Sequence, residues 1–410
     1  MSATKDLTNH IIYTYLMSNK RIGSGELFPT DTPIPAGRMI GRGDEVSAIV
    51  RSLQGAGNLI IAGPRRTGKT SVCDAALGRL VDDGCYVAAV DLFRLADTAD
   101  FAEQLVMSTI ANRGSLKRLA HKARRAGRAL ADAAALTATV RACAELGEEL
   151  DLAFRPGLAS QDPDRYLTYA LELPQRIAGA DGRRLVVFFD EFQEVASPRH
   201  PFGDPDRLTK RMRAIFQRSP DVSFLFAGSM EHLMRDLFVP TERALSQFGS
   251  FYPLSPIPPE AWREGITERL AEDGCTIAPD ALERLLLAGE GHPRVTMLIA
   301  RWTHESSLVD ATRTITDTHV SAGIRAAQLA DLPKHEQTLE RIRSLGRHTQ
   351  RLVIRVARGA QLYSGLNPKL ANDALRALRD TGVIEQTIPR QWHITDPLLR
   401  NFLASLDHGG

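Results

Sequence analysis

One short stretch of the chain combines closely spaced glycines with a lysine and a hydroxyl group. Gly63, Gly68, Lys69 and Thr70 complete the pattern G-x-x-x-x-G-K-[ST] within IAGPRRTGKTSV, residues 61–72. In this pattern the glycines let backbone N–H groups surround a polyphosphate at a helix N-terminus, where the helix dipole also favours negative charge. The lysine reaches the β- and γ-phosphates, and the threonine hydroxyl binds Mg²⁺. The sequence therefore predicts a site for ATP and Mg²⁺ formed by Gly63, Pro64, Arg65, Arg66, Thr67, Gly68, Lys69, Thr70 and Ser71.

Two adjacent carboxylates follow the most hydrophobic segment of the chain. Asp190 and Glu191 end the run VVFFDE, residues 186–191. A carboxylate at the end of such a strand can hold Mg²⁺ through water, so Asp190 is predicted to share the metal with Thr70. A second carboxylate can act as the base toward the attacking water, which is the role predicted for Glu191. An acidic pair after a strand is also typical of a helix N-terminus or a solvated turn, and the upstream phosphate loop is what favours hydrolysis.

Alternating strands and helices are predicted to position these residues. Apolar runs at residues 58–63, 85–93, 186–189 and 221–229 are typical of short buried strands. Helices are predicted from Asp44 as N-cap through Leu53, and over residues 70–84 and 208–218. The fold class is therefore predicted as α/β, a P-loop NTPase with a parallel, doubly wound sheet.

Changes in composition divide the chain into four predicted parts. Residues 1–35, interrupted by three prolines near their end, form an N-terminal extension, and residues 36–255 form the ATPase core with a helical insertion at about 94–180. Strand patterns stop after FYPLSPIPPE, so residues 256–335 are predicted to be an all-α lid. Residues 336–410 are predicted to form helix, helix, two short strands and a closing helix, which together describe a winged helix-turn-helix domain.

The composition limits the class of protein. The chain is 43% hydrophobic and 24% charged, an ordinary balance for a globular protein, and its net charge of +2 restricts any nucleic-acid surface to a local patch. Four scattered cysteines have no spacing typical of a disulfide framework or a zinc site. No apolar run approaches the ~18 residues that a membrane span requires, so we expect a cytoplasmic protein without a membrane partner.

Several motifs occur in the order found in the AAA+ ATPases. More narrowly, residues 36–405 resemble the archaeal-type and STAND-like ATPases related to origin-recognition initiators. MIGRGDEVSAI is similar to the family's first box, which implies that Ile40, Gly41 and Arg42 pack near the adenine. GPRRTGKTS is close to the phosphate loop common in this branch, and VVFFDEFQE resembles its acidic strand, with the glutamine of a D-E-x-Q pattern.

The same resemblance implies further catalytic residues. Ser229 stands at the sensor-1 position, which contacts the γ-phosphate or the attacking water. Arg294, within GHPRVTMLIARW, stands at the sensor-2 position and would reach the γ-phosphate from the lid. A trans-acting arginine is expected after sensor 1, where Arg243 is favoured over Arg235, although either also fits a surface salt bridge. The implied catalytic set is Lys69, Glu191, Ser229, Arg294 and Arg243, and a trans-acting arginine implies a homo-oligomer or a partner protein.

Two basic segments suggest contacts with phosphates. RGSLKRLAHKARRAGR, residues 113–128, is predicted to be an amphipathic helix with a basic outer face, which is also typical of a plain solvated helix. In the C-terminal module, Arg343, Arg347, Arg351 and Arg355 recur every fourth residue and form one stripe if a single helix carries them, whereas a break at Gly346 would divide it. Lys369 and Arg376 lie in the predicted recognition helix. These residues favour DNA binding, although winged helices also bind proteins.

The predicted function is an ATP-binding and ATP-hydrolysing AAA+/STAND-like ATPase that couples nucleotide state to DNA or to a partner. Two other functions share the same site and stay open. One is a slow nucleotide switch in a signalling or defence scaffold, and the other is an ATP-gated transcription regulator.

Overall fold

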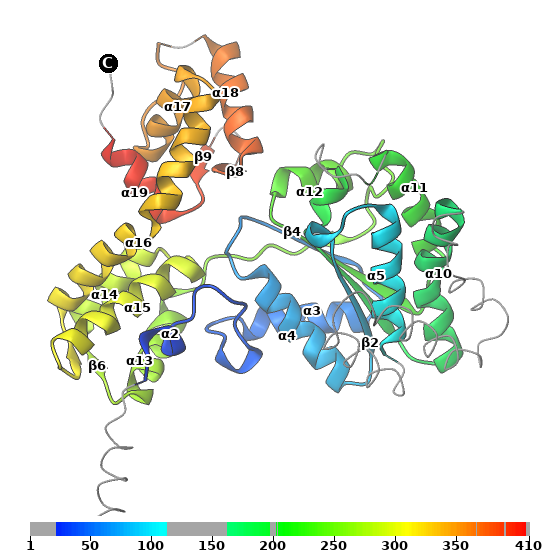
Figure 1. Cartoon of the computed structure of the whole chain (residues 1–410), viewed down its shortest axis with the longest axis horizontal. Coiled ribbons are helices and arrows are strands. Elements are labelled where there is room, and N and C mark those ends of the chain that lie inside the picture. Colours follow the sequence, from blue (N-terminus) through cyan, green and yellow to red (C-terminus); the bar gives the residue numbers. More distant parts are fainter. Residues whose placement is uncertain are drawn as a thin grey trace, which may run out of the picture. The chain divides into compact units, whose positions relative to one another are not determined.

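The computed structural model describes residues 22–112, 162–196, 202, 204–365, 367–388 and 391–406 (Figure 1). The chain divides into two compact units, Pro35–Ser255 and the combination of Met1–Ile34 with Pro256–Gly410. We call the first the sheet unit and the second the helical unit. None of the helices in the described part of the chain combines the length and apolar character needed to span a membrane.

The sheet unit is built on five parallel strands in the order β2-β3-β4-β1-β5. The strands are β1 Leu59–Ala62, β2 Tyr86–Asp91, β3 Leu185–Asp190, β4 Val222–Gly228 and β5 Ser250–Phe251. The predicted α/β fold with a parallel sheet is therefore confirmed. The fifth strand was not predicted, because its two residues are too short to show any periodicity.

Both faces of this sheet are buried, and successive residues of β3 enter different cores. Val187 and Phe189 pack in the core under one set of helices, whereas Val186 and Phe188 pack under the other. The first set is α5 Thr98–Ile110, α10 Pro163–Asp181, α11 Pro205–Phe216 and α12 Glu231–Phe238; the second is α3 Gly43–Gln54 and α4 Lys69–Asp82 (Figure 1). Burial on both faces explains why β3 is a continuous apolar run rather than an alternating one.

Some predicted boundaries in this unit shift. Helix α3 begins at Gly43, so Asp44 lies in its first turn rather than at the N-cap, where it still complements the helix dipole. Helix α11 begins three residues earlier than predicted, after Asp204, whose side chain accepts from the Asp206 N–H. Helices α5 and α10 lie within the predicted helical insertion and pack on the sheet, and the basic stretch at 113–128 lies outside the described residues.

The helical unit starts with four helices around two very short strands. They are α13 Pro259–Glu272, β6 Thr276–Ile277, α14 Pro279–Gly289, α15 Pro293–Val309, β7 Thr314–Ile315 and α16 Asp317–Ser344. Strands β6 and β7 form a parallel pair, so the prediction of an all-α lid is wrong in this detail. Helix α16 also runs through the predicted domain boundary at residue 335, with Pro333 inside it, so the predicted lid and C-terminal module share one helix.

The C-terminal part of this unit has its own small core. Helices α17 Arg347–Ala357 and α18 Pro368–Asp380 are followed by the antiparallel hairpin β8 Ile384–Ile388 and β9 Gln391–Ile394, and by α19 Pro397–Ser405. Buried Leu352, Leu375 and Ile384 pack together with Ile394 and Leu403 from the last two elements. The order of elements is helix, helix, hairpin and helix.

Residues 22–34 are part of the helical unit and not a separate N-terminal extension, which corrects the predicted domain division. The short helix α2, Ser24–Leu27, packs against α15. Leu27 and Phe28 are fully buried, and Arg269 on α13 donates to the Leu27 carbonyl oxygen at 2.6 Å. The apolar pair and this buried hydrogen bond hold the segment in place.

Candidate active site

The phosphate-loop pattern forms the connection between β1 and α4. Gly68 adopts φ of +87°, a left-handed conformation that favours glycine, and α4 begins at the next residue. The Lys69 side chain is buried, and its Nζ donates to the carbonyl oxygens of Gly63 at 2.8 Å and Pro64 at 2.5 Å. The Thr67 hydroxyl also donates to Pro64, at 2.9 Å. The loop therefore curls around the ammonium group of its own lysine.

Thr70 and Asp190, the two predicted Mg²⁺ ligands, lie together although 120 residues separate them in the chain. The Thr70 hydroxyl donates to Asp190 Oδ2 at 3.2 Å. Thr70 stands in the first turn of α4, and Asp190 ends β3. Hydroxyl and carboxylate oxygens are the donors that Mg²⁺ prefers, so the residues present fit this ion.

The environment of Asp190 disfavours its negative charge. Its pKa is raised to about 6, chiefly because burial penalises the ionised form and secondly because the Glu191 carboxylate is close. Asp91, its partner across the β2–β3 ladder, acts in the same direction, whereas hydrogen bonds from the Glu191 N–H and the Thr70 hydroxyl lower the pKa. A divalent cation at this carboxylate would favour the charged form.

Glu191 is held in a strained backbone conformation with its carboxylate directed at the end of β4. Its φ is +50°, and its N–H donates to Asp190 Oδ1 at 2.9 Å. Its Oε2 accepts from Ser229 Oγ at 2.6 Å and from Gln193 Nε2 at 2.5 Å. Because β4 lies between β1 and β3, the residue that follows β4 stands between the phosphate loop and the acids.

Gln193 is a site residue to which the sequence assigned no role. It is fully buried in the 3₁₀ segment Phe192–Ala196, and its Oε1 accepts from the Ser229 N–H at 3.1 Å. A Cβ at Gly228 would lie 2.7 Å from this oxygen, so the close approach requires glycine there. The glutamine of the D-E-x-Q pattern was the only sequence signal for it.

Two arginines of the predicted nucleotide-binding set, Arg65 and Arg42, contact different parts of the sheet unit. Arg65 Nε donates to Ser229 Oγ at 3.4 Å, so one of the two loop arginines contacts the residue at the predicted sensor-1 position. Arg42, just after Gly41 at φ of +60°, is 4% exposed and donates to Glu45 at 2.7 Å. Its Nε and second terminal nitrogen have no hydrogen-bond partner within the described residues. The stretch that leads into α3, which contains Ile40, Gly41 and Arg42, therefore has buried donors on Arg42 that lack an acceptor within the described residues.

Arg294 forms a buried ion pair inside the helical unit. Its two terminal nitrogens each donate to one oxygen of Asp331, both at 2.6 Å, linking α15 to α16. The two side chains are 12% and 6% exposed. The contact with the γ-phosphate that the resemblance implies stays a prediction.

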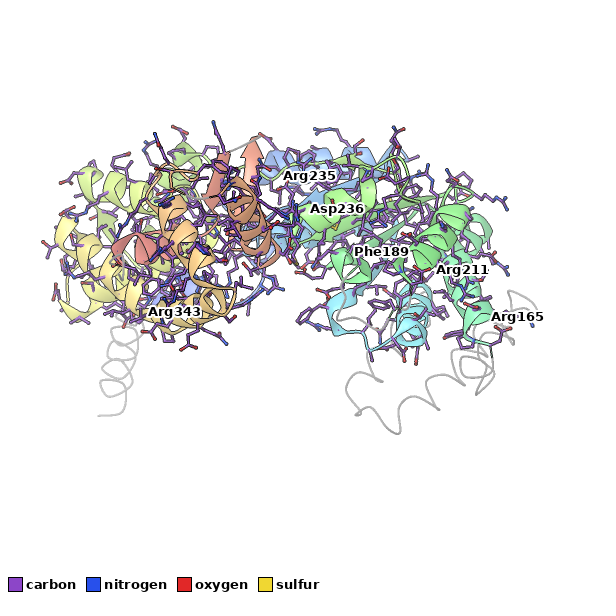
Figure 2. The ribbon with its side chains drawn as sticks, turned by 90° about the horizontal axis from the view of Figure 1, so that it is seen from above. Arg165, Phe189, Arg211, Arg235, Asp236 and Arg343 are labelled. Atoms are coloured by element: carbon purple, nitrogen blue, oxygen red, sulfur yellow. The ribbon has the colours of Figure 1, made fainter. Side chains whose placement is uncertain are left out.

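Arg235 and Arg243 both lie in ion pairs at the surface of the sheet unit. Arg235, on α12 (Figure 2), pairs with Glu231 at 2.7 Å, and its guanidinium lies over the Phe251 ring. Arg243 pairs with Asp206 at 2.9 Å. Side-chain exposures of 57% and 44% leave both accessible, so the geometry does not choose between them as the trans-acting arginine.

The condition for a single stripe, that one helix carries all four arginines, is not met. Arg343 lies near the end of α16 (Figure 2), and Gly346 with φ of +112° separates it from α17, which carries the other three. Arg347 and Arg351 are exposed, whereas Arg355 donates to the Ser364 carbonyl oxygen at 2.6 Å. On α18, Lys369 and Arg376 are exposed, and Arg376 lies 3.7 Å from Asp373.

Two solved archaeal structures share this fold. The Walker-type ATPase PABY2304 of Pyrococcus abyssi has a TM-score of 0.65 and 14% sequence identity, and the match covers 92% of this chain and 99% of that one. The Aeropyrum pernix ORC2 protein, in its ADPNP–ADP complexes, has a TM-score of 0.56 and 16% identity, covering 92% and 95%. Comparisons with protein-family models and with curated protein sequences yield no match. The chain therefore shares the fold of these two proteins, as the resemblance implied.

Proposed function

We propose that this chain binds ATP with Mg²⁺ and hydrolyses it. The observation that carries the proposal is that four residues from three segments come together. The Thr70 hydroxyl donates a hydrogen bond to Asp190, and the Ser229 hydroxyl donates one to the adjacent Glu191. Bound Mg²⁺ would supply positive charge for the developing charge on the phosphates, with Thr70 and Asp190 as the residues that hold it.

Glu191 is the base in this proposal, and its neighbours fix its direction. Ser229 and Gln193 donate to the same carboxylate oxygen, so they orient the group toward the end of β4. Arg65, in contact with Ser229, brings a positive charge to the same edge of the sheet. A carboxylate held in a fixed orientation can accept a proton from the attacking water and later release it without reorienting its side chain.

The substitution Glu191→Gln tests this role. It keeps the size of the side chain and its acceptor oxygen but removes the base, so nucleotide affinity is expected to hold while turnover falls about 10²- to 10⁴-fold. Nucleotide binding is measured by fluorescence with a labelled ATP analogue and turnover by phosphate release. Glu172→Gln, which changes an exposed glutamate paired with Arg176 on α10, is the matched control and should leave both values unchanged. Unimpaired turnover in Glu191→Gln would contradict the proposal.

We assign the base end of the nucleotide to the stretch before α3. The unpartnered nitrogens of buried Arg42 are donors that a nucleotide's polar atoms would satisfy, because a buried donor left without an acceptor is costly. Ile40 and Gly41 lie beside it in the chain, in the box that the resemblance places near the adenine.

We further propose that the C-terminal module is a winged helix that engages DNA. Support comes from the order of its elements and from the exposed cations Arg343, Arg347, Arg351, Lys369 and Arg376. Cations of this kind contact phosphates and position a protein without reading base sequence. ATP turnover that is slow and indifferent to duplex DNA would instead favour the switch scaffold.

Assembly with a second copy is part of the proposal. An exposed arginine at position 235 or 243 could complete a neighbour's site, and both are accessible in the sheet unit. Light scattering with and without ATP gives the mass of the assembly. A mass of one chain under both conditions, with DNA also present, would contradict it.

A further inference from the structure

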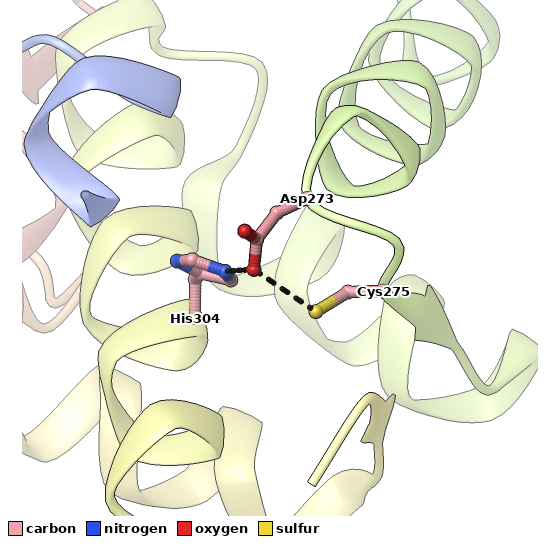
Figure 3. A group of neighbouring side chains, drawn as sticks. All are labelled: Asp273, Cys275 and His304. Atoms are coloured by element: carbon pink, nitrogen blue, oxygen red, sulfur yellow. Dashed lines mark hydrogen bonds and ion pairs between the residues drawn. The ribbon is translucent and has the colours of Figure 1, made fainter. Parts of the chain in front are cut away.

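Three side chains with metal-binding atoms meet in the interior of the helical unit, outside the proposed ATPase site. Asp273 caps the end of α13, Cys275 follows it across the turn at Gly274, and His304 comes from α15 (Figure 3). The three are 6%, 2% and 0% exposed, respectively. Carboxylate, thiolate and imidazole together form a donor set typical of a zinc site.

Two of the three distances between these donor atoms are close to those of a tetrahedral site. His304 Nε2 lies 3.2 Å and Cys275 Sγ lies 3.7 Å from the same Asp273 Oδ2, and all three atoms are within 4.8 Å of one another. Ligands bound to Zn²⁺ at 2.0–2.3 Å are about 3.3–3.6 Å apart along the edges of the tetrahedron. We propose that Asp273, Cys275 and His304 bind a divalent transition-metal ion of the zinc class.

The hydrogen bonds around His304 orient its ring for this role. The Ser24 hydroxyl donates to Glu305 at 2.7 Å, so toward His304 Nδ1, 2.9 Å away, it acts as the acceptor. The Nδ1 nitrogen therefore carries a proton, and the Nε2 lone pair faces Asp273 and Cys275. A histidine ligand that donates its other N–H to an oxygen is the usual arrangement in metal sites.

The charge of the cluster suits a divalent ion in a buried place. Bound through a thiolate, a carboxylate and a neutral imidazole, a 2+ ion gives a site with no net charge. Neutrality matters here because an uncompensated charge is costly in the interior. Sulfur and nitrogen donors also favour zinc-class ions over Mg²⁺ and Ca²⁺, which prefer oxygen.

A second buried cluster, Asp331 with His335 and Asp396, provides a useful contrast. Arg294 donates to both oxygens of Asp331, and Lys334 Nζ lies 3.9 Å from Asp331 and 3.8 Å from Asp396. Side-chain cations already supply the positive charge among these carboxylates. The proposal therefore applies to the cysteine-containing cluster alone.

Metal content is the first test. The full chain, produced with added zinc and dialysed against metal-free buffer, is expected to carry about one zinc per molecule. Cys275→Ser and His304→Gln should lose it, whereas Cys85→Ser, which changes the partly buried cysteine of the sheet unit, should retain it. Wild-type protein without bound zinc after this treatment would overturn the proposal, as would equal content in Cys275→Ser.

Cobalt spectroscopy gives a second test, which begins with the wild-type protein and so does not depend on how well the ligand variants fold. Co²⁺ added to metal-free wild-type protein should produce a thiolate charge-transfer band and the strong visible bands of tetrahedral coordination. Ser24→Ala keeps all three ligands but loses the oxygen on Nδ1, so it should bind Co²⁺ about 10- to 100-fold more weakly. Absence of the thiolate band in the wild type would show a cluster joined by protons only, and unchanged Co²⁺ affinity in Ser24→Ala would contradict the assigned orientation of His304.

Discussion

At the scale of single residues, motifs predicted the candidate site where its chemistry is local in sequence. Residues 63–71 and the pair Asp190 and Glu191 needed only spacing and a preceding strand. The contacts of Gln193 and Arg65 with Ser229 could not be predicted, because they depend on β4 lying between β1 and β3. Strand order is set by long-range pairing, which a single sequence does not display.

The cluster of Asp273, Cys275 and His304 illustrates the same limit. Asp273 and His304 are 31 residues apart, and no short spacing pattern joins them. The scattered cysteines therefore show no spacing typical of a zinc site. Packing of α13 and the following turn against α15 is what brings the three donors together.

The raised pKa of Asp190 leads to a prediction about stability. A carboxyl group with a pKa near 3.8 when unfolded and about 6 when folded contributes stability below pH 4 that is lost as pH rises through 6. Asp190→Asn, which cannot ionise, should therefore stabilise the nucleotide-free chain at pH 7.5 by on the order of 2–3 kcal/mol. Urea unfolding at pH 7.5 and pH 4.5 measures this difference. The gain should shrink at the lower pH, and a variant no more stable than wild type at pH 7.5 would refute the assignment.

At the scale of elements, length decided what could be predicted. The longer strands and helices were recognised from periodic or continuous apolar runs, whereas β5, β6 and β7 have two residues each and show no period. The change in composition from the lid to the C-terminal module predicts a domain boundary at residue 335. The structure instead continues one helix of 28 residues through it.

The crossing of α15 and α16 gives a prediction at this scale. A Cβ at Gly323 would lie 2.3 Å from Thr303 Oγ1 and 2.7 Å from the Thr303 backbone nitrogen. Gly323→Ala should therefore lower the free energy of unfolding by about 1–3 kcal/mol, because the helices would have to separate. Gly78→Ala is the matched control, since a Cβ there meets no atom within 4 Å in the interior of α4. That change should stabilise by about 0.5–1 kcal/mol, so thermal unfolding should show opposite signs. Equal effects would contradict the close packing at Gly323.

At the scale of the whole molecule, the proposed DNA binding is tested by how its affinity depends on salt concentration. If Arg347 and Arg351 contact phosphates, binding to duplex DNA should weaken steeply with added salt, and replacing both by glutamine should lower the salt slope by about 2. Fluorescence anisotropy with a labelled duplex measures this. Arg176→Gln with Arg207→Gln removes the same charge from the surface of the sheet unit and should leave the slope unchanged. No binding at low salt, or an equal loss in the control, would refute DNA engagement through α17.

The position of α2 has a consequence for how the chain is made. Ile22 donates to Asp273, and Ser24 contacts His304, across 251 and 280 residues of sequence. At translation rates of about 5–20 residues per second, this segment leaves the ribosome on the order of 10 to 60 s before its partners exist. The whole sheet unit, Pro35–Ser255, is synthesised during that interval. Leu27 and Phe28 must therefore stay without their final apolar contacts while the whole sheet unit is synthesised.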